Sequence, residues 1–312
     1  MLSPEGRCKT LDASADGYLR AEACGVLTLL PSQGADTHAA FPASALEQPL
    51  ALLVGSAVNQ DGRSSSLTAP NGPAQQAVIR AALASGSSQV QRHRGGPVGF
   101  SPHDLTLLGL HGTGTPLGDP IELGAAASAL LQPPPTSSRT TAATTMPLSP
   151  SSPPLCLASS KAWTGHAEPA AGVVGLLQAF LSARHCLVAP LLNLRSLNPH
   201  LRDTLESAGA SGTGGGVPPR GVAMPRQAGP TPVAEGRERF LCGVSAFAYQ
   251  GTNAHLLCAA SPPASTSAPA ALGGLAAAMQ KAAWDIQRCW VVPPPRALAA
   301  GVSVTATPHL LR

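Results

Sequence analysis

The chain has 312 residues, enough for one large domain or two of ordinary size. Only 12% of the residues are charged and 3% are aromatic, but an apolar fraction of 44% can still build a core of Ala, Val and Leu. The formal net charge is +4 and the basic residues are scattered, without a basic stripe or interleaved aromatics, which argues against nucleic-acid binding.

Segments rich in Ser, Thr, Pro, Gly or Ala interrupt the chain and divide it into compact blocks. We expect low-complexity insertions near residues 86–102, 132–154 and 208–236, a similar stretch at residues 32–49, and a linker and tail over 259–312. The blocks between these segments are predicted to form one fold with long loops.

The first blocks contain two predicted strands and a helix. Residues 24–30, CGVLTLL, are nearly all apolar and predict a buried strand. A second strand is expected over residues 51–58. The helix that follows begins at Pro73, a favoured residue for a first helical turn, and runs to about Leu83.

The third block, HGTGTPLGDPIEL, follows a predicted apolar strand over residues 105–110. It places His111 on a loop of glycine and threonine, and a helix begins at Pro120. Asp119 and Glu122 are suitable for general acid–base chemistry, but their spacing also fits a capping box. We prefer the capping interpretation for both carboxylates.

The remaining blocks add a strand over residues 154–160, a loop with Lys161 and His166, and an apolar helix over residues 170–183. That helix is apolar on all sides, so we expect it to be central and buried. Two strand-like runs surround a glycine-containing turn between residues 240 and 258. This alternation of strands and helices predicts a layered α/β fold.

His111 and His166 follow different predicted strands, and Lys161 lies near the second histidine. Neutral imidazoles can donate hydrogen bonds to an oxygen on which negative charge develops, so the pair suits carbonyl chemistry. A lysine can hold the polar network and influence histidine protonation. The hydroxyls of Thr113 and Thr115 could bind an amide-rich arm of a substrate.

Five motifs, in order along the chain, give it a resemblance to the C-terminal half of a β-ketoacyl synthase of the type I polyketide or fatty-acid synthase kind. They are GRCKTLDASADGYLRAEACGV (6–26), VGSAVNQDGRSSSLTAPNGPAQQAVIRAAL (54–83), HGTGTPLGDPIE (111–122), SSKAWTGHAEPAAGVVGLLQ (159–178) and CGVSAFAYQGTNAH (242–255). The resemblance implies an incomplete α/β fold of the thiolase-like, layered α-β-α-β-α kind. Residues 1–31 would be the tail of the N-terminal half, and residues 50–258 the C-terminal half.

The resemblance also implies roles for the site residues. His111 and His166 match the two catalytic histidines of the family, and Lys161 matches the lysine that supports the second. Thr113 and Thr115 match positions that contact the phosphopantetheine arm of an acyl carrier protein. The implied reaction is a decarboxylative Claisen condensation of an acyl thioester with malonyl carrier protein.

Three further residues belong to the resembling motifs. Glu168 matches the acid just after the second histidine and is a candidate for substrate binding. Asn253 is another candidate, although fixing the geometry of its turn is the alternative interpretation. His255 is expected to be structural and to form a hydrogen bond within its turn.

The chain departs from the family pattern in its nucleophile, which in the family is a cysteine in a DTACSSS-type elbow. None of the seven cysteines has that context: Cys8, Cys24, Cys156, Cys186, Cys242, Cys258 and Cys289. We therefore expect the chain alone to be inactive in condensation, because no acyl-enzyme can form without a thiolate. Two alternatives remain: a malonyl thioester decarboxylase, or a degenerate, non-catalytic module that docks a carrier protein.

Two more departures affect the surroundings of the site. Trp163 stands near the second histidine and could crowd it. The usual glycine-rich turn before GTNAH is altered by Ala248, Tyr249 and Gln250. Both departures favour the non-catalytic alternative.

The expected partners are an acyl carrier protein and the missing N-terminal ketosynthase half, and a homodimer of the intact enzyme is compatible with the resemblance. The helix over residues 170–183 should pack against the missing half and otherwise leave apolar surface exposed. We expect no nucleic acid and no membrane as partners, because no apolar segment is long enough to cross a bilayer. The cysteines show no CxxC pair or metal-ligand spacing, so we expect reduced thiols in the cytoplasm, no metal site and no bound cofactor.

Overall fold

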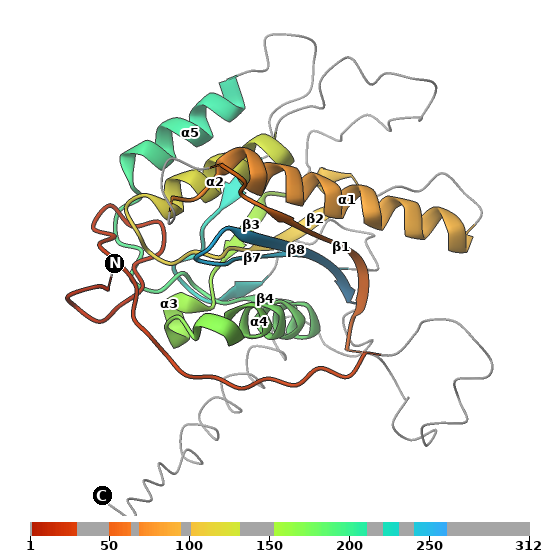
Figure 1. Ribbon diagram of the computed structural model, residues 1–312, viewed down its shortest axis with the longest axis horizontal. Helices are drawn as coiled ribbons and strands as arrows, with labels where there is room; N and C mark the ends of the chain where they lie inside the picture. Colours follow the sequence, from red (N-terminus) through yellow and green to blue (C-terminus); the bar gives the residue numbers. More distant parts are fainter. Residues whose placement is uncertain are drawn as a thin grey trace, which may run out of the picture. The chain divides into compact units, whose positions relative to one another are not determined.

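A mixed sheet of six strands lies at the centre of the fold, in the order β1-β8-β7-β2-β3-β5 (Figure 1). The computed structural model describes residues 2–29, 50–63, 69–94, 101–131, 153–210, 221–230 and 240–260. Outside them lie the predicted stretch at 32–49, the predicted tail beyond residue 260 and nearly all of the insertion predicted at 132–154. Strands and helices alternate through most of the described chain, so the α/β prediction is confirmed.

The strands of this sheet are β1 Leu52–Gln60, β2 Leu105–Gly109, β3 Leu155–Ala158, β5 Val222–Ala223, β7 Phe240–Phe247 and β8 Thr252–Ala260. The central strand β2 runs parallel to both of its neighbours, β3 and β7. β8 runs antiparallel to β7 and to β1. Two short strands, β4 Leu187–Val188 and β6 Gly229–Pro230, pair with each other in a separate sheet. All residues of β2 are buried, as expected for a strand covered on both faces.

Helices cover both faces of the main sheet (Figure 1). α1 Gly72–Arg94 and α2 Gly118–Leu130 lie on one face, and α5 Pro199–Ala210 packs beside α2. α3 Lys161–Thr164 and α4 Ala171–His185 lie on the other face. Short 3-10 helices precede β2 (η3, Pro102–Asp104) and α4 (η5, Glu168–Ala170). None of the helices in the described ranges is long and apolar enough to span a lipid bilayer.

Mainly aliphatic side chains fill the space between the sheet and its helices. On the α1 and α2 face, Leu108, Leu123 and Leu130 are almost completely buried. On the α4 face, Leu107 and Phe240 form part of a second core. A leucine that is fully buried contributes about 1.5–3 kcal/mol relative to one that remains exposed, so a chain with few aromatic residues can still hold these layers together.

α1 is longer than the sequence predicted. We expected it to end near Leu83 and an insertion to occupy residues 86–102, but the helix continues to Arg94. It lies so close to β1 that a Cβ at Gly55 would overlap the backbone of Gly86. This contact holds a part of the helix whose Gly and Ser residues predict a loop, so tertiary packing overrides local propensity.

The buried strand predicted at residues 24–30 is wrong over its described part. Residues 24–29 have no regular secondary structure and are mostly exposed. They run along α4, where Gly25 lies against Val173 (Figure 1). No strand of the described residues pairs with this stretch, and an apolar run needs such a partner to satisfy its backbone as a strand.

The insertion predicted at residues 208–236 contains ordered elements. α5 extends into it as far as Ala210. Further along, β5 pairs with β3, and β6 pairs with β4. The segment expected as a low-complexity insertion therefore contains two short strands, which have too little hydrophobic pattern to be recognised in a stretch rich in Gly and Pro.

α4 is apolar on all sides but only partly buried. Its buried residues are Ala171, Leu176, Ala179, Ser182 and Ala183. Leu181 of this helix is 56% exposed. Val26 and Leu29 of the N-terminal segment and Val58 of β1 are exposed as well. Within the described residues, the predicted full burial of this helix is therefore wrong, whereas the expected exposed apolar surface is present.

Candidate active site

His111 lies directly after β2, on a loop whose path depends on glycine. Gly112 and Gly114 have φ angles of +48° and +77°, a region that other residues rarely adopt. A Cβ at Gly112 would also overlap the side chains of Ser159 and Thr10. The loop therefore holds the imidazole in one place at the carboxyl end of β2.

Two donors approach Nδ1 of His111. The backbone N–H of Phe247, the last residue of β7, donates to Nδ1 over 3.2 Å. The ammonium Nζ of Lys161 lies 3.5 Å from the same nitrogen. Because Nδ1 acts as an acceptor, we infer that the neutral ring carries its proton on Nε2, which remains as a donor for a substrate.

His166 follows α3 and is held by its own loop and by the N-terminal segment. The backbone N–H of Glu168 donates to Nδ1 of His166 over 3.1 Å, so this neutral ring also carries its proton on Nε2. The backbone N–H of His166 donates to the carbonyl of Leu19, and its carbonyl accepts from the N–H of Ala21. The second histidine is therefore fixed on both sides by main-chain contacts.

The two imidazoles are neighbours, as the sequence predicted. Their ring centroids are 5.3 Å apart and their planes meet at 85°. Tyr18 lies edge-on to His166, at a centroid distance of 5.1 Å, and Phe247 lies 5.7 Å from His111. Aromatic rings thus flank the pair on both sides.

Both imidazoles are neutral at physiological pH. Burial lowers the pKa of His111 well below its usual value of 6.5, and the positive charge of Lys161 lowers it further. Burial and the same charge lower the pKa of His166 to about 4. A neutral, partly buried imidazole can donate a hydrogen bond to a developing oxyanion, so these pKa values suit the predicted role.

We expect His166 to titrate with a midpoint at about pH 4 in histidine-detected NMR of the full chain. Because the pKa is lower in the folded state, His166 contributes stability that is present above pH 6.5 and is lost as the pH falls through about 4. A His166→Gln variant identifies the signal. A midpoint near 6.5 would show that the ring is solvated and would contradict the buried site.

Lys161 begins α3 and is only 4% exposed. Burial lowers its pKa to about 8, although the negative charges of Glu122, Cys8 and Asp119 act in the opposite direction. The ammonium group is therefore surrounded by buried acidic groups on one side and by the histidine pair on the other. Its positive charge favours the neutral form of both imidazoles, and the negative charges of Glu122 and Asp119 favour its own charged form.

Glu122 binds the backbone of the His111 loop. Its two carboxylate oxygens accept the N–H groups of His111, over 2.6 Å, and of Gly112, over 2.8 Å. Burial raises the pKa of Glu122 to about 7, and these two hydrogen bonds oppose that shift. Glu122 therefore ties the histidine loop to α2 instead of capping the helix.

Asp119 has a similar role between the same loop and the N-terminal segment. Its carboxylate accepts the N–H groups of Leu11, over 2.7 Å, and of Gly114, over 3.0 Å. Burial raises the pKa of Asp119 to about 6. The first N–H of α2, that of Gly118, donates instead to the hydroxyl of Thr115. The capping-box prediction is therefore wrong, because the loop folds back over the start of the helix.

Thr113 and Thr115 lie on the His111 loop, where the sequence placed them. Their hydroxyl oxygens are 3.1 Å apart, and both residues are half-buried. The Thr115 hydroxyl already accepts the N–H of Gly118. A hydroxyl can still donate once and accept once more, so the pair retains hydrogen-bonding capacity beside His111.

The other two candidates for substrate binding, Glu168 and Asn253, are engaged with other side chains of the chain. The exposed carboxylate of Glu168 forms an ion pair with Arg20 over 3.4 Å. Asn253 is buried on β8, and its amide donates to Asn59 over 3.1 Å and to Asp61 over 2.7 Å. These contacts favour the alternative interpretation of Asn253, in which it fixes the geometry of its turn.

The two departures that could disturb the site are accommodated in the structure. The indole N–H of Trp163 donates to the carbonyl of Pro190 over 2.8 Å, and 41% of the side chain is exposed. The turn between β7 and β8 closes with a hydrogen bond from the N–H of Gly251 to the carbonyl of Ala248, and Tyr249 is exposed. Trp163 is thus engaged with the segment after β4 and does not stack on the histidine pair.

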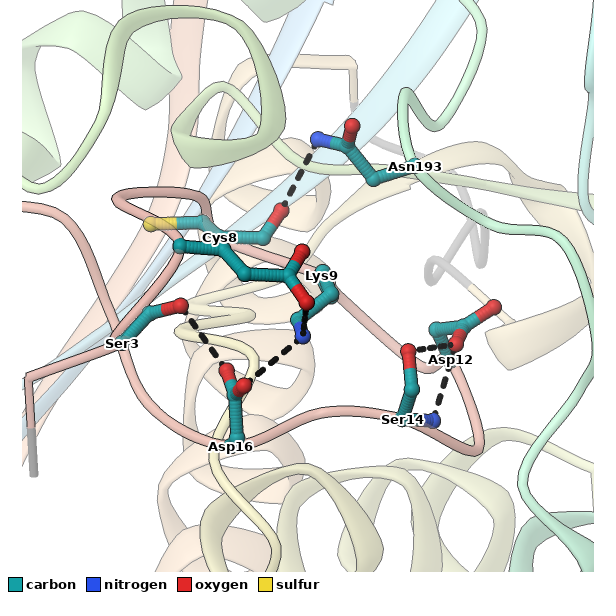
Figure 2. A network of polar contacts seen from close by, with 8 residues as sticks. Ser3, Cys8, Lys9, Asp12, Ser14, Asp16 and Asn193 are labelled. Atoms are coloured by element: carbon teal, nitrogen blue, oxygen red, sulfur yellow. Dashed lines mark hydrogen bonds and ion pairs between the residues drawn. The ribbon is translucent and has the colours of Figure 1, made fainter.

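The N-terminal segment contains a polar network that we did not predict (Figure 2). Asp12 accepts the backbone N–H groups of Arg195, over 2.7 Å, and Ser196, over 2.9 Å. It also accepts the N–H and the hydroxyl of Ser14. Burial alone would raise the pKa of Asp12, but these hydrogen bonds outweigh it and lower the pKa to about 2. The Asp-x-Ser spacing is typical of a side-chain turn and could have revealed this residue.

Asp16 joins a second part of this network (Figure 2). Its carboxylate accepts from the hydroxyl of Ser3 and from the ammonium of Lys9, each over 2.8 Å. The amide of Asn193 donates to the backbone carbonyl of Cys8. These contacts hold the segment that passes over both histidine loops.

None of the cysteines in the described ranges has the features of an activated nucleophile. The described cysteines are all free thiols: Cys8, Cys24, Cys156, Cys186, Cys242 and Cys258. Burial raises the pKa of Cys8, whose sulfur accepts the backbone N–H of Leu19. Burial also raises the pKa of Cys186 and Cys242. The same ranges contain no group of His, Cys, Asp and Glu arranged to hold a metal ion.

Two protein-family models match the sequence. Residues 50–195 match the C-terminal domain of beta-ketoacyl synthase, and residues 1–35 match its N-terminal domain. The matched stretches contain every candidate catalytic residue and, apart from Ser196, the N-terminal network. They do not contain β7 and β8, whose motif places Phe247 beside His111.

Curated relatives are much longer than this chain. It is 37% identical over 262 residues to one of the phenolphthiocerol/phthiocerol polyketide synthase proteins of Mycobacterium tuberculosis, covering 84% of this chain and 10% of the relative. It is 35% identical over 261 residues to erythronolide synthase EryA2 of Saccharopolyspora erythraea, covering 84% of this chain and 6% of that relative. The chain therefore spans at most about a tenth of these proteins.

Solved ketosynthase structures show the same fold. An oxazolomycin ketosynthase domain of Streptomyces albus matches with a TM-score of 0.57 and 26% identity, over 84% of this chain and 38% of that domain. A ketosynthase from module 6 of the bacillaene synthase of Bacillus subtilis matches with a TM-score of 0.57 and 25% identity, with the same coverage. The predicted thiolase-like α/β fold is therefore confirmed, for the part of it that the chain covers.

Proposed function

Since the chain belongs to the β-ketoacyl synthase family, chiefly to its C-terminal half, we propose that its histidine pair promotes the decarboxylation step of a polyketide-type condensation. One observation carries the proposal: backbone N–H groups donate to Nδ1 of both His111 and His166. This supports two neutral rings, 5.3 Å apart, that each keep an Nε2–H donor. Such donors stabilise negative charge that develops on an oxygen.

The proposed step begins with a malonyl thioester. The bond between its carboxylate carbon and its α-carbon breaks, CO₂ leaves, and the electron pair moves into a thioester enolate. His111 and His166 donate to the enolate oxygen. The α-carbon of the enolate then takes a proton from water, which gives an acetyl thioester and leaves hydroxide.

Lys161 has a supporting role in this proposal. Its charge helps to lower the pKa of both imidazoles, so they stay neutral donors throughout the step. Its Nζ also lies 3.5 Å from Nδ1 of His111 and shares that acceptor with Phe247. Lys161 therefore favours the tautomer in which Nε2 carries the proton.

We propose an acyl carrier protein as the source of the substrate. The hydroxyls of Thr113 and Thr115 lie on the His111 loop and keep free hydrogen-bonding capacity. Hydroxyls at this position suit the amide groups of a phosphopantetheine arm, which delivers a thioester to a buried site. No other cofactor is required for the proposed decarboxylation.

Condensation requires more than the described residues supply. The acyl group must be held on a thiolate, and burial raises the pKa of Cys8, the cysteine whose charge acts on Lys161. We therefore propose that the described residues support decarboxylation without acyl transfer. A cysteine from an N-terminal ketosynthase half would complete the site.

Incubation of the full chain with malonyl carrier protein tests the proposal. We expect release of CO₂ and formation of acetyl carrier protein, without transfer of a labelled acyl group to the chain. His200→Ala is the control for variants of His111 and His166, because His200 is a histidine that lies exposed on α5. A folded chain that binds the carrier protein but releases no CO₂ would contradict the proposal and favour a docking module. Formation of an acyl-enzyme would contradict the proposal that the described residues do not transfer an acyl group.

A further inference from the structure

β7 and β8 carry a buried polar pair that the proposed reaction does not use. Ser245 on β7 and His255 on β8 are directly opposite each other, and Ser245 Oγ lies 3.0 Å from His255 Nδ1. Ser245 is 5% exposed and His255 is 0% exposed. The partner of His255 is thus on the neighbouring strand, so the predicted hydrogen bond within its turn is wrong.

The ring of His255 lies on the backbone of β7. A Cβ at Gly243 would lie 2.9 Å from Nε2 of the ring and 2.9 Å from a methyl group of Leu105. Only glycine at this position leaves room for the imidazole between the strand and the core. His255 therefore contacts β7 at both Gly243 and Ser245.

The contact lies where β7 loses the support of its parallel neighbour. The ladder between β2 and β7 ends at the pair Gly109 and Val244. Among the residues that the structure describes, Ser245 and the two residues after it in β7 pair with β8 alone. Two residues beyond Ser245, the N–H of Phe247 donates to Nδ1 of His111.

We propose that Ser245 and His255 are positioning residues for His111. Their hydrogen bond adds to the pairing of β7 with β8 beyond the last contact of β7 with β2, so that the N–H of Phe247 stays within reach of His111 Nδ1. They act through the backbone of β7 and touch neither His111 nor a substrate. The pair thereby maintains the tautomer that the proposed reaction needs.

The polarity of His255 supports this role. Its Nε2 is buried and has no hydrogen-bond partner in the described part of the chain. A leucine in the same place would fill the core without an unpaired nitrogen, so packing alone does not account for a histidine. What the imidazole adds is a directed bond to Ser245, and burial lowers its pKa to about 4, so it forms that bond as a neutral ring.

The tautomer of His111 in ¹⁵N-labelled full-length protein tests the inference. In the wild type, we expect a single Nε2–H tautomer for His111. Ser245→Ala should give a mixture of tautomers and raise the pKa of His111 by about 0.5 unit or more, because an N–H that donates to Nδ1 stabilises the neutral ring. Lys161, Glu122 and His166, which surround His111, are unchanged in this variant.

Two further variants make the test decisive. His255→Phe keeps a ring over Gly243 but removes the bond to Ser245, so it should reproduce the effect of Ser245→Ala. Cys258→Ala is the control. It truncates a buried residue of β8 on the opposite side of the sheet, which faces α4, and should leave the tautomer of His111 unchanged. An unchanged tautomer in both folded test variants would overturn the inference. An equal change in Cys258→Ala would also overturn it, by showing general loosening of the strand.

The inference rests on the proposed function, because it assigns the pair to the tautomer that decarboxylation requires. The NMR measurement needs no substrate, so it reports on positioning even if the chain releases no CO₂. Absence of turnover with a responsive His111 would refute the proposed function alone. Turnover with an unresponsive His111 would refute the positioning role alone.

Discussion

Replacement of His111 by asparagine is expected to lower decarboxylation of a malonyl thioester by about 10²–10³-fold, the usual effect of removing one donor from an oxyanion site. The oxygen of a shorter asparagine side chain can take the place of Nδ1 and accept the N–H of Phe247. It has no group at the place of Nε2. The variant therefore keeps the contact that holds the loop and loses the contact proposed for the enolate.

His111→Gln is the matched variant. Its longer side chain can bring an amide N–H to the place of Nε2, so we expect it to retain more activity than asparagine. The rate of CO₂ release from malonyl pantetheine measures both variants, and thermal unfolding checks that they fold. Equal rates for the wild type and the asparagine variant would show that His111 does not stabilise the enolate.

His166 provides an independent check on the same idea. Its Nδ1 is occupied by the N–H of Glu168, so its Nε2 is the donor left for the substrate, as in His111. If both rings contact one enolate oxygen, a double variant should lose less than the product of the two single effects. Residues that act as a unit are not additive in this way.

The sequence predicts the strand, loop and helix around His111 because every local signal agrees there. The apolar run of β2 is followed by glycines, and these glycines adopt the positive φ angles that the loop needs. His166 and Lys161 can be predicted for the same reason, since they too follow a short buried strand. Their distance from His111 follows because parallel strands end at one edge of the sheet.

The roles of Asp119 and Glu122 could not be predicted from local rules. A capping box describes residues within one turn of helix, whereas Asp119 accepts the N–H of Leu11, which is 108 positions away. Glu122 accepts from the loop that precedes its own helix. Nothing in the spacing of the two carboxylates distinguishes these partners from a helix cap.

The tautomer of His111 is equally invisible in the sequence. It depends on the N–H of Phe247, which comes from a strand 136 positions further along the chain. The predicted length of α1 is too short for a related reason, because Gly55 on β1 lies against the helix at Gly86, beyond the predicted end of the helix. The tautomer and the helix length both depend on a backbone contact between distant parts of the chain, and such contacts cannot be predicted from the pattern of side chains.

Asp12→Ala is expected to lower the free energy of unfolding by about 2–4 kcal/mol, because two partly exposed backbone N–H groups lose a charged acceptor, and a hydrogen bond to a charged group contributes roughly 1.5–3 kcal/mol. Asp12 is 3% exposed, and its Oδ2 accepts the N–H groups of both Arg195 and Ser196. The shift of its pKa from 3.8 to about 2 gives a stabilisation of similar size, about 2–3 kcal/mol, at neutral pH. Urea denaturation at neutral pH measures the loss, with Asp203→Ala on the exposed side of α5 as the control.

Asp12→Asn separates charge from shape. The pKa of Asp12 is lower in the folded state, so its carboxylate contributes stability that is present above pH 3.8 and is lost as the pH falls through about 2. The difference in stability between the wild type and Asp12→Asn should therefore shrink as the pH is lowered through this window. A difference that stays constant would show that the carboxylate is not the group that stabilises the fold.

The segment that contains Asp12 also contacts both histidine loops. The adjacent Leu11 donates to Asp119, which holds the His111 loop, and further along the same segment Leu19 accepts the N–H of His166. Release of this segment should loosen both histidine loops together. We therefore expect Asp12→Ala to lower the decarboxylation rate even at temperatures where the variant is fully folded. An unchanged rate would show that Asp119 and Leu19 keep their contacts without the Asp12 anchor.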